Sequence, residues 1–309
     1  MKAVFARLFG LPTAVDARVR SFAVASLVVQ ILIVATGGAV RLTGSGLGCP
    51  TWPLCTDDSL VATPEMGVHG AVEFGNRLLS IIVGIIAVIL VVLLIRMARQ
   101  RRDLFVPALL VLVGTVVQGI IGGISVRIRL DPFLVGSHFI ISAALVALAT
   151  VVVYRAFAGP RGEEWSAPAW LRILTHVTSL LVAITVVVGV LTTGSGPHAG
   201  DSTADRNGLN PELLQHVHSW PAYVTFAVSV ALLIASFRRG GRLRRFLIVL
   251  VAIEVVQIIV GVTQSRLGLP ELLVGVHMVL AVCLVSAMTA VVLSLRAALP
   301  VADGSSSTH

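Results

Sequence analysis

Charged residues are scarce in this sequence. Asp, Glu, Lys and Arg make up 12% of the 309 residues, whereas hydrophobic residues make up 56%. A soluble domain of this length has too little interior to bury so much apolar surface, so soluble enzymes and soluble binding modules are excluded. The composition predicts an integral membrane protein.

Apolar stretches of about 20 residues, the length that a helix needs to cross a bilayer, occur eight times. Charged residues or clusters of Pro and Gly bound each stretch. We therefore expect an all-α fold with eight transmembrane helices, at residues 21–40, 69–95, 105–126, 133–154, 171–192, 213–237, 246–265 and 271–296.

Acidic residues are fewer than basic ones, 15 against 23, which gives a net charge of +8. Nucleic-acid binding does not explain this excess, because the basic residues gather in the loops on one side of the expected membrane. If the N-terminus is cytoplasmic, that side receives 17 of the 23. We therefore expect a multi-pass plasma-membrane protein in contact with lipid, with both termini in the cytoplasm. The 17 residues are Lys2, Arg7, Arg18, Arg20, Arg96, Arg99, Arg101, Arg102, Arg155, Arg161, Arg172, Arg238, Arg239, Arg242, Arg244, Arg245 and Arg296.

Cysteine is almost absent, with three in the whole chain. Cys49 and Cys55 share the first expected outer loop, and Cys283 lies in the last span. The oxidising outer face of a bacterial-type membrane allows the loop pair to form a disulfide. A metal site is the weaker interpretation, because no other loop cysteine can complete it.

The chain contains an internal repeat. Residues 122–146 and 261–285 align without a gap at an offset of 139, which pairs His138 with His277. Further pairs at this offset are Gly122 with Gly261, Arg127 with Arg266, and Gln118 with Gln257.

The first spans of the two halves also correspond, because residues 34–46 and 186–196 both end in Thr-Gly-Ser-Gly. Two halves with an even number of spans must have the same orientation in the membrane, which is a parallel repeat. We therefore expect two pseudo-symmetric four-helix bundles. The expected segments are a cytoplasmic N-terminal segment (1–20), an N-terminal half (21–154), a cytoplasmic linker (155–170), a C-terminal half (171–296) and a cytoplasmic tail (297–309).

Four of the eight histidines lie at one expected depth. Each follows a proline by five to seven residues, about 8–10 Å inside the outer end of an even-numbered span. Two imidazoles that face each other in a four-helix bundle are suited to bind a heme iron from both sides. An interfacial hydrogen-bonding role and a proton relay are the alternatives. The four are His69, His138, His218 and His277.

The start of the second span is unusually polar for a membrane helix. His69, Glu73 and Asn76 advance by four and three residues, so they share one helix face. A buried carboxylate at Glu73 can accept or deliver a proton beside a bound ring. Arg77 can pair with a heme propionate or with Glu73. A Glu–Arg pair that serves structure alone is the competing interpretation.

Five segments together resemble the heme A synthase family, over the whole chain. The most distinctive is TGGAVRLTGSGLGCPTWPLC (36–55), in which the first span runs into two loop cysteines around a Trp-Pro. The others are EFGNR (73–77), FLVGSHF (133–139), LLQHVHSW (213–220) and LLVGVHM (272–278).

The resemblance implies an enzyme that oxidises a methyl group of heme O to a formyl group, giving heme A for cytochrome c oxidase. It implies that the C-terminal half binds heme b through His218 and His277. The N-terminal half would receive heme O, with His138 facing the substrate iron, and Glu73 matches a glutamate thought essential for activity.

Cys49 and Cys55 match the loop cysteine pair of the family. The resemblance also implies the farnesylating heme O synthase as a partner that hands over the substrate. A homo-oligomer is left open, and the sequence names neither the electron acceptor nor the source of the inserted oxygen.

The sequence departs from the family pattern in the second span, where Asn76 replaces a histidine. Asparagine is a poor heme ligand, so either His69 compensates or His138 acts without a partner from this helix. The outer loop at 194–210 also lacks the cysteine pair that some relatives have there.

The sixth span contains both His216 and His218, which point about 200° apart on a helix, so only one can reach an iron. The motif spacing favours His218. Glu254 lies in the middle of the seventh span without an evident partner. Four arginines at outer ends are suited either to propionates or to interfacial anchoring: Arg41, Arg127, Arg129 and Arg266.

A non-catalytic diheme electron carrier or quinol-linked membrane cytochrome is the alternative function. Its helices and histidines would look the same, but it has no need of Glu73. A transporter is disfavoured, because no span is broken in its middle.

Overall fold

The computed structural model describes residues 10–238 and 241–298, and eight of its helices are long and apolar enough to cross a membrane. This confirms the all-α, eight-span architecture. The spans are α2 (Ala17–Leu42), α3 (Gly67–Leu94), α4 (Arg102–Arg127), α5 (Pro132–Ala158), α6 (Ala169–Ser195), α7 (Pro211–Ser236), α8 (Gly241–Arg266) and α9 (Glu271–Leu293). The short elements are the 3-10 helices η1 (Pro64–Met66) and η2 (Ile95–Met97) and the strands β1 (Arg161–Trp165) and β2 (Arg296–Ala298).

The two ends of the chain are only partly described. The expected N-terminal segment up to residue 9 and the expected tail from residue 299 lie outside the described residues. The last span ends at Leu293, before the expected residue 296, because Arg296 begins a strand.

Side-chain caps mark the start of several spans. Asp16, Asp131 and Asn210 each accept a hydrogen bond from a main-chain N–H in the first turn of α2, α5 and α7. Pro132 and Pro211 take the first helical position after two of these caps, where no N–H is needed. Because lipid offers the main chain no hydrogen bonds, such caps help to set where each span begins.

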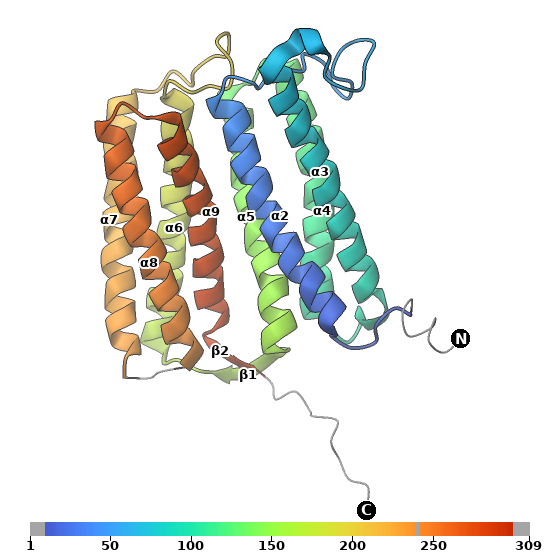
Figure 1. Cartoon of the computed structure of the whole chain (residues 1–309). Coiled ribbons are helices and arrows are strands. Elements are labelled where there is room, and N and C mark those ends of the chain that lie inside the picture. The colour runs from blue at the N-terminus through green and yellow to red at the C-terminus, as the bar shows by residue number, and fades with distance from the viewer. Residues whose placement is uncertain (1–9, 239–240, 299–309) are drawn as a thin grey trace, which may run out of the picture.

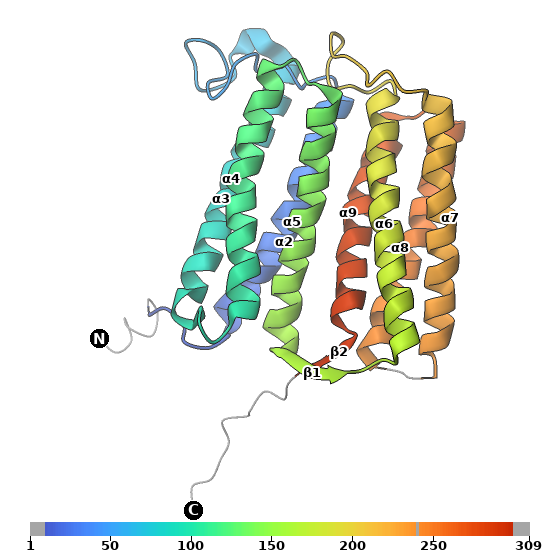
Figure 2. The ribbon, with the colours of Figure 1, turned by 180° about the vertical axis from the view of Figure 1, so that it is seen from behind.

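The eight helices form two groups of four (Figures 1 and 2). In one group the neighbours around a ring are α2, α3, α4 and α5, and in the other they are α6, α7, α8 and α9. The helices α3 and α5 therefore lie diagonally across the first ring, and α7 and α9 lie diagonally across the second. The groups meet where α2 and α5 pack against α9 and where α5 packs against α6. The division of the chain into the expected segments and the parallel-repeat symmetry stay predictions.

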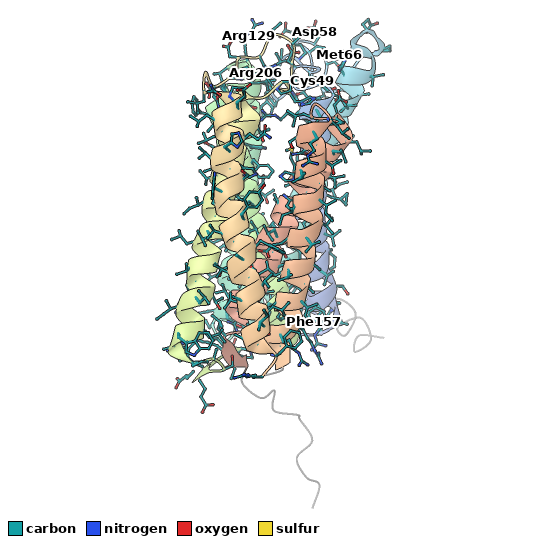
Figure 3. The ribbon with its side chains drawn as sticks, turned by 90° about the vertical axis from the view of Figure 1, so that its left-hand side faces the viewer. Cys49, Asp58, Met66, Arg129, Phe157 and Arg206 are labelled. Carbon is teal, nitrogen blue, oxygen red and sulfur yellow. A yellow bond between two sulfur atoms is a disulfide. The ribbon has the colours of Figure 1, made fainter. Side chains whose placement is uncertain are left out.

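The two ends of the bundle differ in content. We call the end where α2 begins and α9 ends the inner end, and the other the outer end (Figure 1). The long loops after α2 and α6 gather at the outer end, where Figure 3 labels Cys49, Asp58, Arg129 and Arg206, whereas Phe157 lies near the inner end. Which end faces the cytoplasm stays a prediction.

The two largest hydrophobic clusters lie toward the inner end. One includes Leu171, Leu247 and Leu295 of the second group, and the other includes Leu94 and Leu104 of the first group.

The expected linker at 155–170 is not a plain loop. It contains β1, which pairs antiparallel with β2 after the last span. The Trp165 ring lies close to two guanidinium groups, 4.2 Å from that of Arg172 and 3.7 Å from that of Arg296. The small sheet fastens the inner ends of α6 and α9 together.

Candidate functional site

Two imidazoles meet across the second ring. His218 projects from α7 and His277 from α9, and their ring centres lie 6.2 Å apart with an angle of 75° between the planes. A metal bound by both imidazoles at about 2 Å places their ring centres about 6 Å apart. The observed spacing therefore fits one iron between the two rings. His216, the other histidine of α7, has an exposed side chain.

The main chain of the preceding helix orients His218. Its Nδ1 lies 3.0 Å from the main-chain oxygen of Thr185 on α6. A carbonyl oxygen only accepts hydrogen bonds, so Nδ1 carries the proton and Nε2 keeps a free lone pair. This is the tautomer that a heme ligand needs.

Glycine makes room for both imidazoles of this pair. Gly189 lies one helical turn after Thr185, and a Cβ there would be 2.8 Å from Cε1 of His218. On α8, a Cβ at Gly261 would be 3.0 Å from Cε1 of His277. Each ring can press against the neighbouring helix only because these positions have no side chain.

The second hairpin of each group repeats one arrangement. Gln257 on α8 donates through Nε2 to the main-chain oxygen of His277 at 3.1 Å, and Gln118 on α4 donates in the same way to His138 at 2.8 Å. Gly122 lies against the His138 ring as Gly261 lies against the His277 ring, with 3.7 Å from a Cβ to Cε1. The repeat noted in the sequence therefore places both histidines alike.

His138 and His277 also keep unpaired nitrogen atoms. The imidazole of His277 interacts with the main-chain carbonyl of Gln257. Within the described residues, however, the buried Nδ1 atoms of His138 and His277 have no partner at hydrogen-bonding distance. Buried polar atoms without a partner at that distance are unusual.

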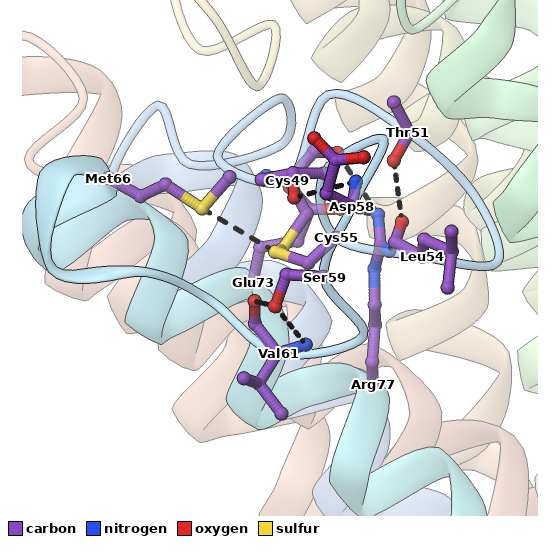
Figure 4. Close-up of a disulfide and its surroundings, with 11 residues drawn as sticks. Cys49, Thr51, Leu54, Cys55, Asp58, Ser59, Val61, Met66, Glu73 and Arg77 are labelled. Atoms are coloured by element: carbon purple, nitrogen blue, oxygen red, sulfur yellow. Dashed lines mark hydrogen bonds and ion pairs between the residues drawn. A yellow bond between two sulfur atoms is a disulfide. The ribbon is translucent and has the colours of Figure 1, made fainter.

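On α3, Glu73 and Arg77 clasp the first outer loop (Figure 4). Oε2 of Glu73 accepts from the main-chain N–H of Cys49 at 2.6 Å, and Oε1 forms an ion pair with Arg77. Arg77 also donates to the main-chain oxygens of Cys49 and Leu54, both at 3.1 Å. Cys49 is bonded to Cys55, which confirms the expected disulfide. The Glu73–Arg77 pair therefore has a structural role. Two partners were expected for Arg77, a heme propionate or Glu73, and the structure shows the ion pair with Glu73.

The disulfide loop covers the outer end of the first ring. Arg127 donates to the main-chain oxygen of Trp52 at 3.0 Å. The indole of Trp52 packs so closely on Gly123 of α4 that a Cβ there would overlap the ring. Gly123 directly follows Gly122, the glycine that lies against His138, so Trp52 reaches the same turn of α4.

Arg41 joins the outer loops of the two groups. Its guanidinium donates to the main-chain oxygens of His198 at 2.8 Å and Thr193 at 3.1 Å. Beside it, the main-chain N–H of Gly46 donates to the oxygen of Gly200 at 2.8 Å. Arg41 therefore caps the end of α6, a role that the sequence did not suggest.

His69 lies apart from the inward residues. Its side chain is exposed, its Nδ1 is 2.9 Å from Oγ of Ser45, and it lines a hollow between the outer loops. Asn76, two turns deeper on α3, accepts through Oδ1 from the hydroxyl of Thr36 on α2 at 2.7 Å. That His69 serves as a replacement ligand stays a prediction.

Glu254 of α8 has a partner after all. Its Oε1 accepts from the hydroxyl of Ser229 on α7 at 2.8 Å. Its buried Oε2 has no partner in the part of the chain that the structure describes. The pair joins two neighbouring helices of the second ring.

Sequence reasoning missed the supports of the histidines. Gly122 and Gly261 were visible as a repeated pair, but their role follows only from the imidazoles beside them. Thr185 acts through its main chain, so its side-chain type gave no signal.

The sequence was compared with known proteins. A family model described as cytochrome oxidase assembly protein (COX15-CtaA) matches residues 20–289. A heme A synthase of Exiguobacterium sibiricum is 28% identical over 167 residues, which are 52% of this chain and 54% of that protein. One of Geobacillus kaustophilus is 32% identical over 139 residues, 43% of each chain. One of Methylobacterium radiotolerans is 29% identical over an alignment of 327 residues that covers 87% of each chain.

The matches differ in extent. The chain spans about half the length of the Exiguobacterium relative, while the Methylobacterium alignment extends over most of both proteins. Together with the eight membrane-spanning helices, these findings identify a multi-pass protein of the plasma membrane.

Alkylation of free thiols tests the disulfide. Of the three cysteines only Cys283 is free, so the denatured protein should take up one label before reduction and three after it. Intact mass measures the number of labels, and a Cys283→Ser variant should take up none without reductant. Three labels before reduction would contradict the disulfide.

Replacing Gly189 by Ala tests the support of His218. The added Cβ, 2.8 Å from Cε1, must displace the ring, because carbon atoms pack at about 3.5–4.0 Å. We expect heme b per chain, measured as the pyridine complex in protein purified without a source of heme O, to fall roughly tenfold, as for other supports of metal ligands. Gly119→Ala, with nothing within 4 Å, is the control. Equal heme content in both variants would refute the role.

Proposed function

The chain belongs to the cytochrome oxidase assembly protein family, and on that premise we propose that it is a heme A synthase, which oxidises a methyl group of heme O to a formyl group. Relatives that carry this name support the proposal. The structural observation that carries it is the pair of facing imidazoles, 6.2 Å between ring centres, inside a membrane bundle.

The second ring is the proposed site of heme b, with His218 and His277 as its ligands. Heme b supplies electron transfer when it is bound. The Thr185 carbonyl holds the proton on Nδ1 of His218, and the two glycines let both rings lie against their neighbouring helices. The chain itself fixes the orientation of the ligands, which supports a permanent cofactor in this half.

The first ring is the proposed site of heme O. His138 of α5 has its imidazole beside Gly122 of α4, and Gln118 fixes the main chain at that histidine. The disulfide loop lies over the outer end, with Trp52 against α4. Such a cover keeps bulk water away from a reacting methyl group.

Glu73 is the proposed proton-accepting residue of the first ring. Both of its oxygens are engaged, one by the N–H of Cys49 and one by Arg77. It therefore takes up a proton only by exchanging one of these partners. This couples the proposed chemistry to the position of the disulfide loop.

Substitution of His277 by Ala tests the heme b ligands. Loss of one of two axial ligands should abolish the low-spin heme b spectrum of the purified protein. His216→Ala, which removes an exposed histidine from α7, should leave that spectrum unchanged. An unchanged spectrum in His277→Ala would remove this histidine from the site.

Glu73→Gln separates the enzyme from a diheme electron carrier. We expect heme b to stay bound while heme A, extracted after co-expression with a source of heme O, falls about a hundredfold or more. The exposed Glu65→Gln is the matched control. Heme A at the wild-type level in Glu73→Gln would remove Glu73 from the reaction. A wild-type extract with neither heme A nor its hydroxylated precursor would refute the enzyme.

A further inference from the structure

The two rings differ at one inward position. In the second ring, the diagonal helices α7 and α9 both contribute a histidine. In the first ring, α5 contributes His138. The α3 residue that is hydrogen-bonded to the preceding helix is Asn76, which accepts from the hydroxyl of Thr36 on α2. His218 of α7 also bonds to the preceding helix, through the main-chain oxygen of Thr185 of α6.

Asn76 and His218 occupy matching places along their hairpins. Both α2 and α6 run into the same Thr-Gly-Ser-Gly motif, which contains Ser45 in one case and Ser195 in the other. Thr36 lies nine residues before the first serine, and Thr185 lies ten residues before the second. One residue of helix is about 1.5 Å, so the two contacts lie at nearly the same depth.

His69 does not fill the gap. It is the only histidine of α3 and lies seven residues before Asn76, about 10 Å nearer the outer end. Its ring is exposed and bonded to Ser45. Ligands that share one iron must come as close as His218 and His277, whose ring centres are 6.2 Å apart.

From these observations we propose that the first ring binds an iron porphyrin through His138 alone and leaves the iron position on the α3 side without a protein ligand, open to a small uncharged ligand. The Oδ1 atom of Asn76 is engaged by Thr36, and its amide nitrogen is a donor, not a metal ligand. This inference rests on the proposed function, because that function places heme O in the first ring.

Binding of carbon monoxide tests the open position. The full-length protein, purified after co-expression with a source of heme O, is reduced and exposed to the gas. We expect about half of the bound heme to take up carbon monoxide, because heme b with two histidine ligands has no free position. Before reduction, the same fraction should give a high-spin electron paramagnetic resonance signal.

Variants at the α3 position provide the contrast. Asn76→His places an imidazole at this position, and should lower carbon monoxide binding at least tenfold. Asn76→Leu is the matched control and should keep it. The low-spin heme b signal reports in every variant that the protein is folded.

Two results would overturn the inference. One is a wild-type protein with two hemes that are both low-spin and do not bind carbon monoxide. This result counts against the inference even if His69→Ala restores binding. The other is a protein that takes up only one heme. Pigments extracted from the same samples report the proposed function separately: gas binding without heme A refutes the function alone, and heme A from an entirely low-spin protein refutes the inference alone.

Discussion

The contact between an inward imidazole and the backbone of the preceding helix is the constraint on which the candidate sites depend. A helix carbonyl already accepts one hydrogen bond from its own turn, and its second lone pair is reached only where no side chain stands in the way. At His218 the carbonyl of Thr185 and the bare Cα of Gly189 meet this condition. Because that bond fixes which nitrogen carries the proton, packing within one hairpin decides the ligand chemistry at the centre of the ring.

The outer loops make the first ring depend on charge as well as on packing. Glu73 and Arg77 are both withdrawn from water, and removing either alone would leave a buried charge without its partner. Main-chain groups of the loop form hydrogen bonds with the atoms of Glu73 and Arg77 that the ion pair does not use. The disulfide limits how far those main-chain groups can move. Arg41 extends the same arrangement to the second group, so neither outer surface is independent of the other.

The sequence predicted the spans because they follow from a short-range rule, apolar run length, and it placed four histidines by their depth below a helix end. The sequence could not choose among the histidines from their angular positions on a helix. Whether a side chain points into or out of the bundle depends on where the neighbouring helices lie. His216 and His69 show this, because each lies on a predicted span and each is exposed. Contacts between distant segments were out of reach for the same reason, as in the pairing of Arg161 with Ala298.

If the proposed function holds, there is a physical reason why the second ring offers two histidine ligands and the first ring only one. A cofactor that stays bound gains from two protein ligands, because both bonds must break before it leaves. A substrate that enters as heme O and leaves as heme A must dissociate in every cycle, so one bond from His138 gives faster release than two.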